Sequence, residues 1–149
     1  MAKNINIKNR KAFYEYHILD KYEAGIKLQG TEIKAIREGR ASLGEAYCYF
    51  NASALYIKNM NIAEYSMGNI NNHEPLRERK LLLHKRELKK LYDEIQKGNT
   101  TIIPLRLYIN AKGLAKMEIA LAQGKKLHDK RQAIKEKDIE RDMKRDMRL

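Results

Sequence analysis

The sequence has few residues that build disulfides or metal sites, because Cys48 is its single cysteine. No internal disulfide is possible and no metal-ligand spacing is present, so we expect neither a metal nor a cofactor and predict a small buried thiol. Apolar runs are short, and none approaches the roughly 18 residues of a spanning helix. Met1–Asn6 also lacks the apolar run of a signal peptide. We therefore expect a cytoplasmic protein that makes no membrane contact.

Catalytic motifs are missing as well. The chain contains no phosphate-binding loop and no GxGxxG, HExxH, GxSxG or CxxC motif. Its four histidines are far apart in sequence: His17, His73, His84 and His128. No pattern places one of them beside a nucleophile. The sequence therefore favours binding over catalysis, although an active site assembled from distant segments would escape such a search.

Positive charge is abundant, with 31 Lys and Arg against 19 Asp and Glu and a formal net charge of +12. Such an excess favours a polyanionic partner, because binding releases counterions. Nucleic acid is the leading candidate, and a membrane surface would attract the same charge. The excess is densest between residues 77 and 90, where the cations are Arg77, Arg79, Lys80, Lys85, Arg86, Lys89 and Lys90. These side chains either contact the phosphate backbone of a nucleic acid or form an ordinary solvent-exposed helix face.

Alternating apolar residues and turn residues predict a mainly β fold. We expect strands over 14–28, 46–50, 54–62, 101–109 and 114–121, with the second and third forming a hairpin. Gly25 suggests a bulge or bend in the first strand. Pro104 places its strand at an edge or beside a bulge, because proline cannot donate to the ladder. The Gly- and Asn-rich segment 66–75 predicts a loop.

Two helices are expected between these strands. Thr31 is a candidate N-cap for a short helix over 31–38, with Ile33 and Ile36 as its buried pair. Apolar residues recur at helical spacing from Leu88 to Ile95, which predicts a helix over 84–97 that Gly98 ends. The elements together predict an α+β or barrel fold, with an oligonucleotide-binding (OB) barrel as one candidate.

Aromatic residues are mostly tyrosines: the chain has nine and no tryptophan. Six lie in the expected strands: Tyr14, Tyr16, Tyr22, Tyr47, Tyr49 and Tyr56. Tyrosines on an exposed sheet face can stack on bases. More often they are half-buried packing residues, and we expect most of the six to be structural.

The composition changes at residue 124, which divides the chain into a body over 1–123 and a tail over 124–149. The tail has 10 Lys and Arg and 6 acidic residues among 26. It holds too few apolar residues to fold alone, but many of its residues favour helix. We therefore predict a tail that is disordered when free and helical when bound.

Four sequence strings resemble one family closely: Glu23–Ile26, Gly30–Lys34, His73–His84 and Gly124–Arg131. The chain is similar to the small protein B family of SsrA-binding proteins from about Asn9 onwards. The resemblance implies an OB-type barrel that binds the tRNA-like domain of transfer-messenger RNA (tmRNA). It also implies delivery of that RNA to stalled ribosomes, with the tail probing the small-subunit decoding centre and the empty mRNA channel.

This resemblance implies a monomeric trans-translation factor that is not an enzyme. A structural ribosomal protein and an RNA-processing nuclease are the alternatives. Glu23, Leu82 and His84 match positions where the family contacts the RNA, and Tyr16 and Tyr47 match positions usually held by tyrosine. The resemblance assigns ribosome engagement to tail residues Gly124, Lys125, Lys126, His128, Asp129, Lys130 and Arg131. Arg77, Arg79, Lys80, Lys85 and Arg86 complete the expected RNA-binding set.

Overall fold

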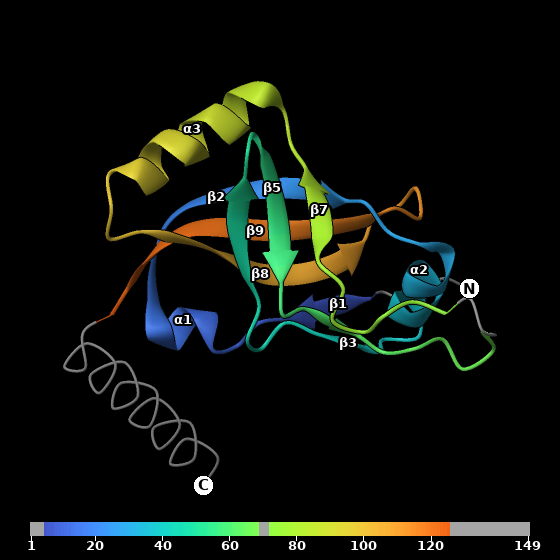
Figure 1. Ribbon diagram of the computed structural model, residues 1–149. Coiled ribbons are helices and arrows are strands. Elements are labelled where there is room, and N and C mark those ends of the chain that lie inside the picture. The colour runs from blue at the N-terminus through green and yellow to red at the C-terminus, as the bar shows by residue number, and fades with distance from the viewer. Residues whose placement is uncertain (1–4, 69–71, 126–149) are drawn as a thin grey trace, which may run out of the picture.

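The computed structural model describes residues 5–68 and 72–125 (Figure 1). Its strands are β1 (Asn6–Lys8), β2 (Tyr16–Ile26), β3 (Ala41–Ser42), β4 (Tyr47–Asn51), β5 (Ala54–Lys58), β6 (Asn61–Ile62), β7 (Arg79–Leu82), β8 (Thr101–Ile109) and β9 (Ala115–Gly124). The helices are α1 (Ala12–Glu15), α2 (Gly30–Arg37) and α3 (Lys85–Gln96). The predicted mainly β class with short helices is confirmed.

The main sheet closes on itself through antiparallel pairings. Its strands follow the order β1-β8-β4-β5-β7-β2-β9, and β9 pairs back to β8. Six strands therefore form a ring, in which β8 is paired with β4 at Cys48 and Ile102 and with β9 along its length. A closed ring leaves a shared interior on one side of every strand and an outer face on the other.

Two irregularities bend the long strands of this ring. The register of β2 shifts between Ile18 and Asp20, and that of β8 shifts between Pro104 and Arg106. Bulges of this kind increase twist and help a sheet to close. The bulge predicted at Pro104 is confirmed. Of the bulge or bend predicted at Gly25, the bulge is not found, because Gly25 pairs with Leu82 and Lys116 without a register shift.

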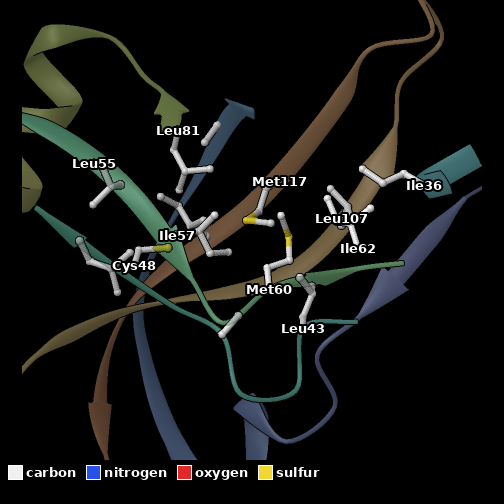
Figure 2. Close-up of a cluster of buried hydrophobic side chains, with 14 of the residues drawn as sticks. Ile36, Leu43, Cys48, Leu55, Ile57, Met60, Ile62, Leu81, Leu107 and Met117 are labelled. Atoms are coloured by element: carbon white, nitrogen blue, oxygen red, sulfur yellow. The ribbon is translucent and has the colours of Figure 1, made fainter. Parts of the chain in front are cut away.

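The core fills the interior of the ring. Side chains from β4, β5, β7, β8 and β9 meet there, and Figure 2 shows Cys48, Leu55, Ile57, Leu81 and Met117 converging among them. Cys48 is 5% exposed, as predicted, and burial raises the pKa of its thiol. Alternation along each strand sends the neighbouring residues to the outer face.

Two helices add apolar side chains to the same core. Ala35 and Ile36 of α2 and Leu91 of α3 are fully buried. In Figure 1, α3 lies over the hairpin of β4 and β5, while α2 lies well away from it on the far side of β7. The end of α3 is as predicted, because Gly98 follows the helix with a φ of 81° and closes its last turn.

A second, smaller apolar cluster lies on the outer face of β8 and β9. Ala12 of α1 packs there against Ile103, Leu105, Ala120 and Ala122, with Tyr16 and Ile18 at its margin. This cluster covers one end of that outer face. The other end, towards the turn between β8 and β9, carries half-buried polar residues: Arg106, Tyr108, Lys116 and Glu118.

Several sequence expectations need correction. Tyr14 lies in α1 and not in a strand, and the predicted strand over 54–62 is two strands separated by Asn59, whose φ is 64°. Asparagine tolerates this left-handed conformation, which interrupts the strand. Gln29, not Thr31, caps α2, and Thr31 instead lies 2.8 Å from His73 Nδ1 through its hydroxyl. Ile33 is only half buried.

Candidate nucleic-acid interface

Strand β7 carries the centre of the candidate site, and it was not predicted as a strand. Its burial alternates strictly, with Arg79 and Leu81 buried and Lys80 and Leu82 exposed. Leu81 pairs with Leu55 of β5 inside the ring, whereas Lys80 pairs with Tyr56 on the outer face. One short strand therefore separates two cations that are adjacent in sequence.

Arg79 is fully buried and belongs to an ion cluster beneath α2. Its Nε donates to Glu32 Oε2, and its Nη1 donates to the Met60 carbonyl at 2.7 Å. Arg77, which is partly exposed, donates to the other oxygen of Glu32. The prediction that Arg79 contacts RNA is wrong, because its guanidinium points into the protein. Arg77 also has its main partner, Glu32, inside the protein.

Glu32 is the anion that makes this cluster possible. It is fully buried, and besides the two guanidinium groups it accepts a hydrogen bond from the Gln29 backbone at 2.8 Å, which caps α2. Burial alone raises the pKa of Glu32, but the hydrogen bonds from Arg77, Gln29 and Arg79 outweigh burial and leave this pKa below its ordinary value. The cluster ties the start of α2 to the start of β7.

Leu82 and Glu23 lie together on the outer face. Leu82 pairs with Gly25 of β2, and Glu23 is two residues before Gly25 and therefore points to the same face. Leu82 is 50% exposed and Glu23 is exposed. A Cβ at Gly25 would lie 3.4 Å from the Cβ of Leu82, so the glycine lets Leu82 lie close against β2. The expectation that both side chains are at the surface is confirmed.

Residues from β8 and β9 extend this patch, and the sequence did not reveal them. Glu118 is the pairing partner of both Glu23 and Arg106, and Arg106 Nε lies 3.4 Å from Glu118 Oε2. The Arg106 guanidinium lies 4.3 Å from the centre of the Tyr108 ring. Partial burial and the nearby carboxylate of Glu23 raise the pKa of Tyr108 to about 12. Only the pairing register places these residues beside Glu23.

Three tyrosines form a row on the outer face of β4 and β5. The rings of Tyr49 and Tyr56 stack with centres 6.1 Å apart, and Tyr47 lies 6.4 Å from Tyr49. Tyr47 is 38% exposed. The hydrogen bond from Tyr49 to Glu78 raises the pKa of Tyr49 to about 12. Tyr47 thus sits at the open end of a row that continues to Lys80.

The other predicted aromatic, Tyr16, has a different setting. It begins β2, is half buried and packs on the apolar cluster beneath α1. This position gives it a packing role, whether or not RNA approaches it. Tyr16 is not part of the row of stacked tyrosines, but Tyr16 and Tyr47 both line one cavity of about 370 Å³.

The remaining predicted residues of the body lead into α3. His84 is the N-cap residue of this helix, and its backbone N–H donates to Glu87 Oε1 at 3.2 Å. Lys85 and Arg86 follow in the first turn and are exposed. Glu87 accepts this cap hydrogen bond, and because Lys85, Arg86 and Lys89 outnumber it, the turn carries a net positive charge.

The first two tail residues belong structurally to the body. Gly124 pairs with Tyr16 at the end of β9, and the Lys125 backbone N–H donates to the Glu15 carbonyl at 2.8 Å. Lys125 Nζ also lies 3.2 Å from the Phe13 carbonyl. The other predicted tail residues lie outside the described residues: Lys126, His128, Asp129, Lys130 and Arg131.

Two further findings concern residues 5–68 and 72–125. Within these ranges no helix has the length and apolar character needed to cross a membrane. The same ranges contain no group of three or more His, Cys, Asp or Glu side chains placed to hold a metal ion.

The sequence of the chain matches one protein family. The family model for SmpB protein matches residues 6–149. The SsrA-binding protein of Cytophaga hutchinsonii is 60% identical over 145 residues, covering 97% of this chain and 95% of that protein. The SsrA-binding protein of Thermosipho africanus is 47% identical over 133 residues, covering 89% of each.

A solved structure agrees with the sequence relatives. It is described as "tmRNA-SmpB: a journey to the center of the bacterial ribosome", and its chain aligns with a TM-score of 0.71 and 41% identity. The alignment covers 87% of this chain and 94% of the other. The class is thus that of the SsrA-binding proteins. The chain belongs to the SmpB protein family.

Proposed function

We propose that this protein is a trans-translation factor that binds the tRNA-like domain of tmRNA and delivers it to stalled ribosomes. Family membership over residues 6–149 supports this function, as does the name SsrA-binding protein shared by its relatives. The protein acts by binding, and no catalytic step is part of the proposal. Work at the ribosome implies a cytoplasmic location and a complex with small-subunit rRNA, which a monomer can form.

The observation that carries the proposal is the exposed pair Glu23 and Leu82. Leu82 is 50% exposed at the end of its strand, so half of this apolar side chain is available to a partner. A carboxylate beside it repels phosphates, but it accepts hydrogen bonds from base edges and 2′-hydroxyl groups. Together they are suited to recognise the shape of a folded RNA, while the nearby Lys80 attracts its backbone.

The test is the affinity of the double variant Glu23→Ala, Leu82→Ala for the isolated tRNA-like domain. We expect a loss of about 30-fold or more, since two central interface residues are typically worth about 2 kcal/mol or more. The circular dichroism spectrum should be unchanged, because both side chains are exposed. A matched control is Glu45→Ala, Leu76→Ala, which removes an exposed acid and an exposed leucine elsewhere. Equal losses in both double variants would contradict the proposed interface.

The tail supports a second part of the proposal, which is engagement of the decoding centre and the empty mRNA channel. Its 10 cations suit an rRNA-lined channel, and Lys130 and Arg131 suit phosphates. Truncation after Lys125 preserves the whole of β9 and its bonds to α1. We expect this truncation to keep tmRNA affinity within about twofold while abolishing tagging of stalled products. Parallel loss of both activities would contradict separate roles for body and tail.

A further inference from the structure

A groove lies between the turn of the β4–β5 hairpin and the side of α3 that carries Leu88 and Tyr92. Its volume is about 500 Å³, which is within the range of roughly 300 to 1,000 Å³ that small-ligand pockets occupy. The hairpin contributes Phe50, Ala52 and Ser53, and the helix contributes Lys85, Leu88, Lys89 and Tyr92. In Figure 1 the tip of this hairpin lies directly beneath α3. None of the residues assigned to the tmRNA interface above, apart from Lys85, lines it.

The walls of this groove are aromatic and apolar. Phe50 and Tyr92 meet edge to face, with ring centres 5.4 Å apart and planes at 88°. Tyr92 is 43% exposed although it sits on the apolar side of α3, next to the half-buried Leu88. An aromatic ring left open in this way offers a stacking surface for another planar group.

The rim of the groove is positive. Lys85 and Lys89 are exposed and one helical turn apart on the same side of α3. The one acid of this turn, Glu87, is held by the cap at the His84 backbone. An anionic group at the rim would therefore contact two cations. An aromatic ring attached to that group would contact Tyr92.

The backbone of the hairpin turn is strained at this position. Ala52 has a φ of 56°, a left-handed conformation that L residues other than Gly, Asn and Asp rarely adopt. The adjoining Ser53 completes the two-residue connection between β4 and β5. The favoured two-residue hairpin turns have a positive φ at their first residue, so this conformation belongs to the turn itself.

We propose that this groove binds one unpaired nucleotide of an RNA strand, as a second RNA contact beyond the Glu23 and Leu82 interface. The base stacks on Tyr92 between the helix and the hairpin, and its phosphate lies between Lys85 and Lys89. Charge complementarity selects RNA over an apolar peptide, because a peptide would gain little from two lysines at the rim. The proposal rests on the proposed function only in taking RNA as the partner.

The test is binding of a fluorescently labelled single-stranded hexamer of adenosine nucleotides to the full chain, measured by anisotropy. We expect Tyr92→Ser to weaken binding about tenfold, from the loss of one stacked base, and Tyr92→Phe to stay within about twofold. Lys89→Gln should weaken binding more than Lys112→Gln, which removes an exposed lysine from the β8–β9 turn. The Glu23→Ala, Leu82→Ala variant should bind the hexamer as the unchanged protein does.

The outcomes separate this proposal from the proposed function. Unchanged hexamer binding by Tyr92→Ser, with the melting temperature also unchanged, overturns the groove as an RNA site and leaves the tmRNA interface intact. Equal losses of hexamer affinity for Lys89→Gln and Lys112→Gln would contradict a phosphate site between Lys85 and Lys89. If the Glu23→Ala, Leu82→Ala variant keeps full affinity for the tRNA-like domain, the proposed tmRNA interface is contradicted. That result does not affect the groove, which the hexamer experiment tests separately.

Discussion

The two halves of the cationic segment 77–90 have opposite roles in this molecule. At its start, Arg77 and Arg79 share the carboxylate of Glu32 beneath α2, and Arg79 is fully buried. Beyond it, Lys80 and the first turn of α3 are exposed, and the nearest acid of that turn is held by the helix cap. Arg77 and Arg79 hold the fold together, whereas Lys80, Lys85 and Arg86 are exposed to an anionic partner, and Lys90 at the end of the segment pairs with Asp20.

The difference shows that burial, more than the type of charge, decides what a cation does. A buried guanidinium must be paired, because an unpaired charge in the interior carries a large desolvation cost. Arg79 satisfies this requirement with Glu32 and with the carbonyls of Met60 and Pro75. An exposed lysine has no such requirement and remains available for phosphates.

The largest effect is expected from Glu32→Ala, which leaves Arg79 buried without its anion. We expect a loss of about 3 to 5 kcal/mol in the free energy of unfolding, as is usual when one partner of a buried ion pair is removed. Urea unfolding followed by circular dichroism measures it. Lys80→Gln is the matched control and should leave the midpoint unchanged. If Glu32→Ala lowers the free energy of unfolding no more than Lys80→Gln does, the buried ion cluster is not more important for stability than the exposed cations.

Lowering the pH should destabilise the protein through the same ion cluster, because Glu32 becomes protonated. The pKa of Glu32 is lowered in the folded state, so its stabilisation is present above the unfolded pKa near 4.5 and is lost as the pH falls through the folded value. The arginines keep their charge throughout. We expect stability to fall as the pH is lowered below about 5, and Glu32→Gln to show a shallower fall over that range. Parallel pH profiles for the two proteins would exclude Glu32 as the titrating group.

The exposed half should affect binding instead of stability. Replacing Lys80 and Arg86 by Gln removes two surface cations outside the ion cluster and outside the groove beside α3. We expect affinity for the tRNA-like domain to fall about tenfold at low salt, with an unchanged urea midpoint. A shifted midpoint with unchanged affinity would reverse the roles assigned to the two halves.

The smallest effect is expected at Lys90, which is exposed on α3 and lies 3.5 Å from Asp20 Oδ2. Exposed ion pairs of this kind contribute little, because water and salt screen them. Lys90→Gln should leave the melting temperature unchanged within error in a thermal scan. A clear drop would show that exposure is a poor guide to the role of a charge in this protein.

Much of the fold could be predicted from sequence periodicity. The helix α3, the β4–β5 hairpin and the β8–β9 pair all follow apolar patterns with clear turn residues at their ends. β7 is not apparent in the sequence, because a buried arginine and an exposed leucine break the usual alternation of apolar and polar residues. Its strand character comes from pairing with β5 and β2, which no local pattern reveals.

The candidate site was predictable only in part. Glu23 and Leu82 are exposed as expected, because each is adjacent in sequence to a buried residue, Ala24 or Leu81, whose side chain points to the other face of the strand. The burial of Arg79 could not be foreseen, because its partner Glu32 is 47 residues away in sequence. Arg106 and Tyr108 were missed for the same reason, as only the register of β8 against β9 brings them to this face.

The salt dependence of binding to the tRNA-like domain tests the division of the cationic segment most directly. The logarithm of affinity should fall linearly with the logarithm of salt concentration, and the slope counts the phosphates neutralised. For Lys80→Gln, Arg86→Gln we predict a slope that is smaller by about 1.4 to 1.8, which corresponds to two lost phosphate contacts. A slope equal to that of the unchanged protein would contradict the account, because the exposed cations would then not contact the RNA backbone.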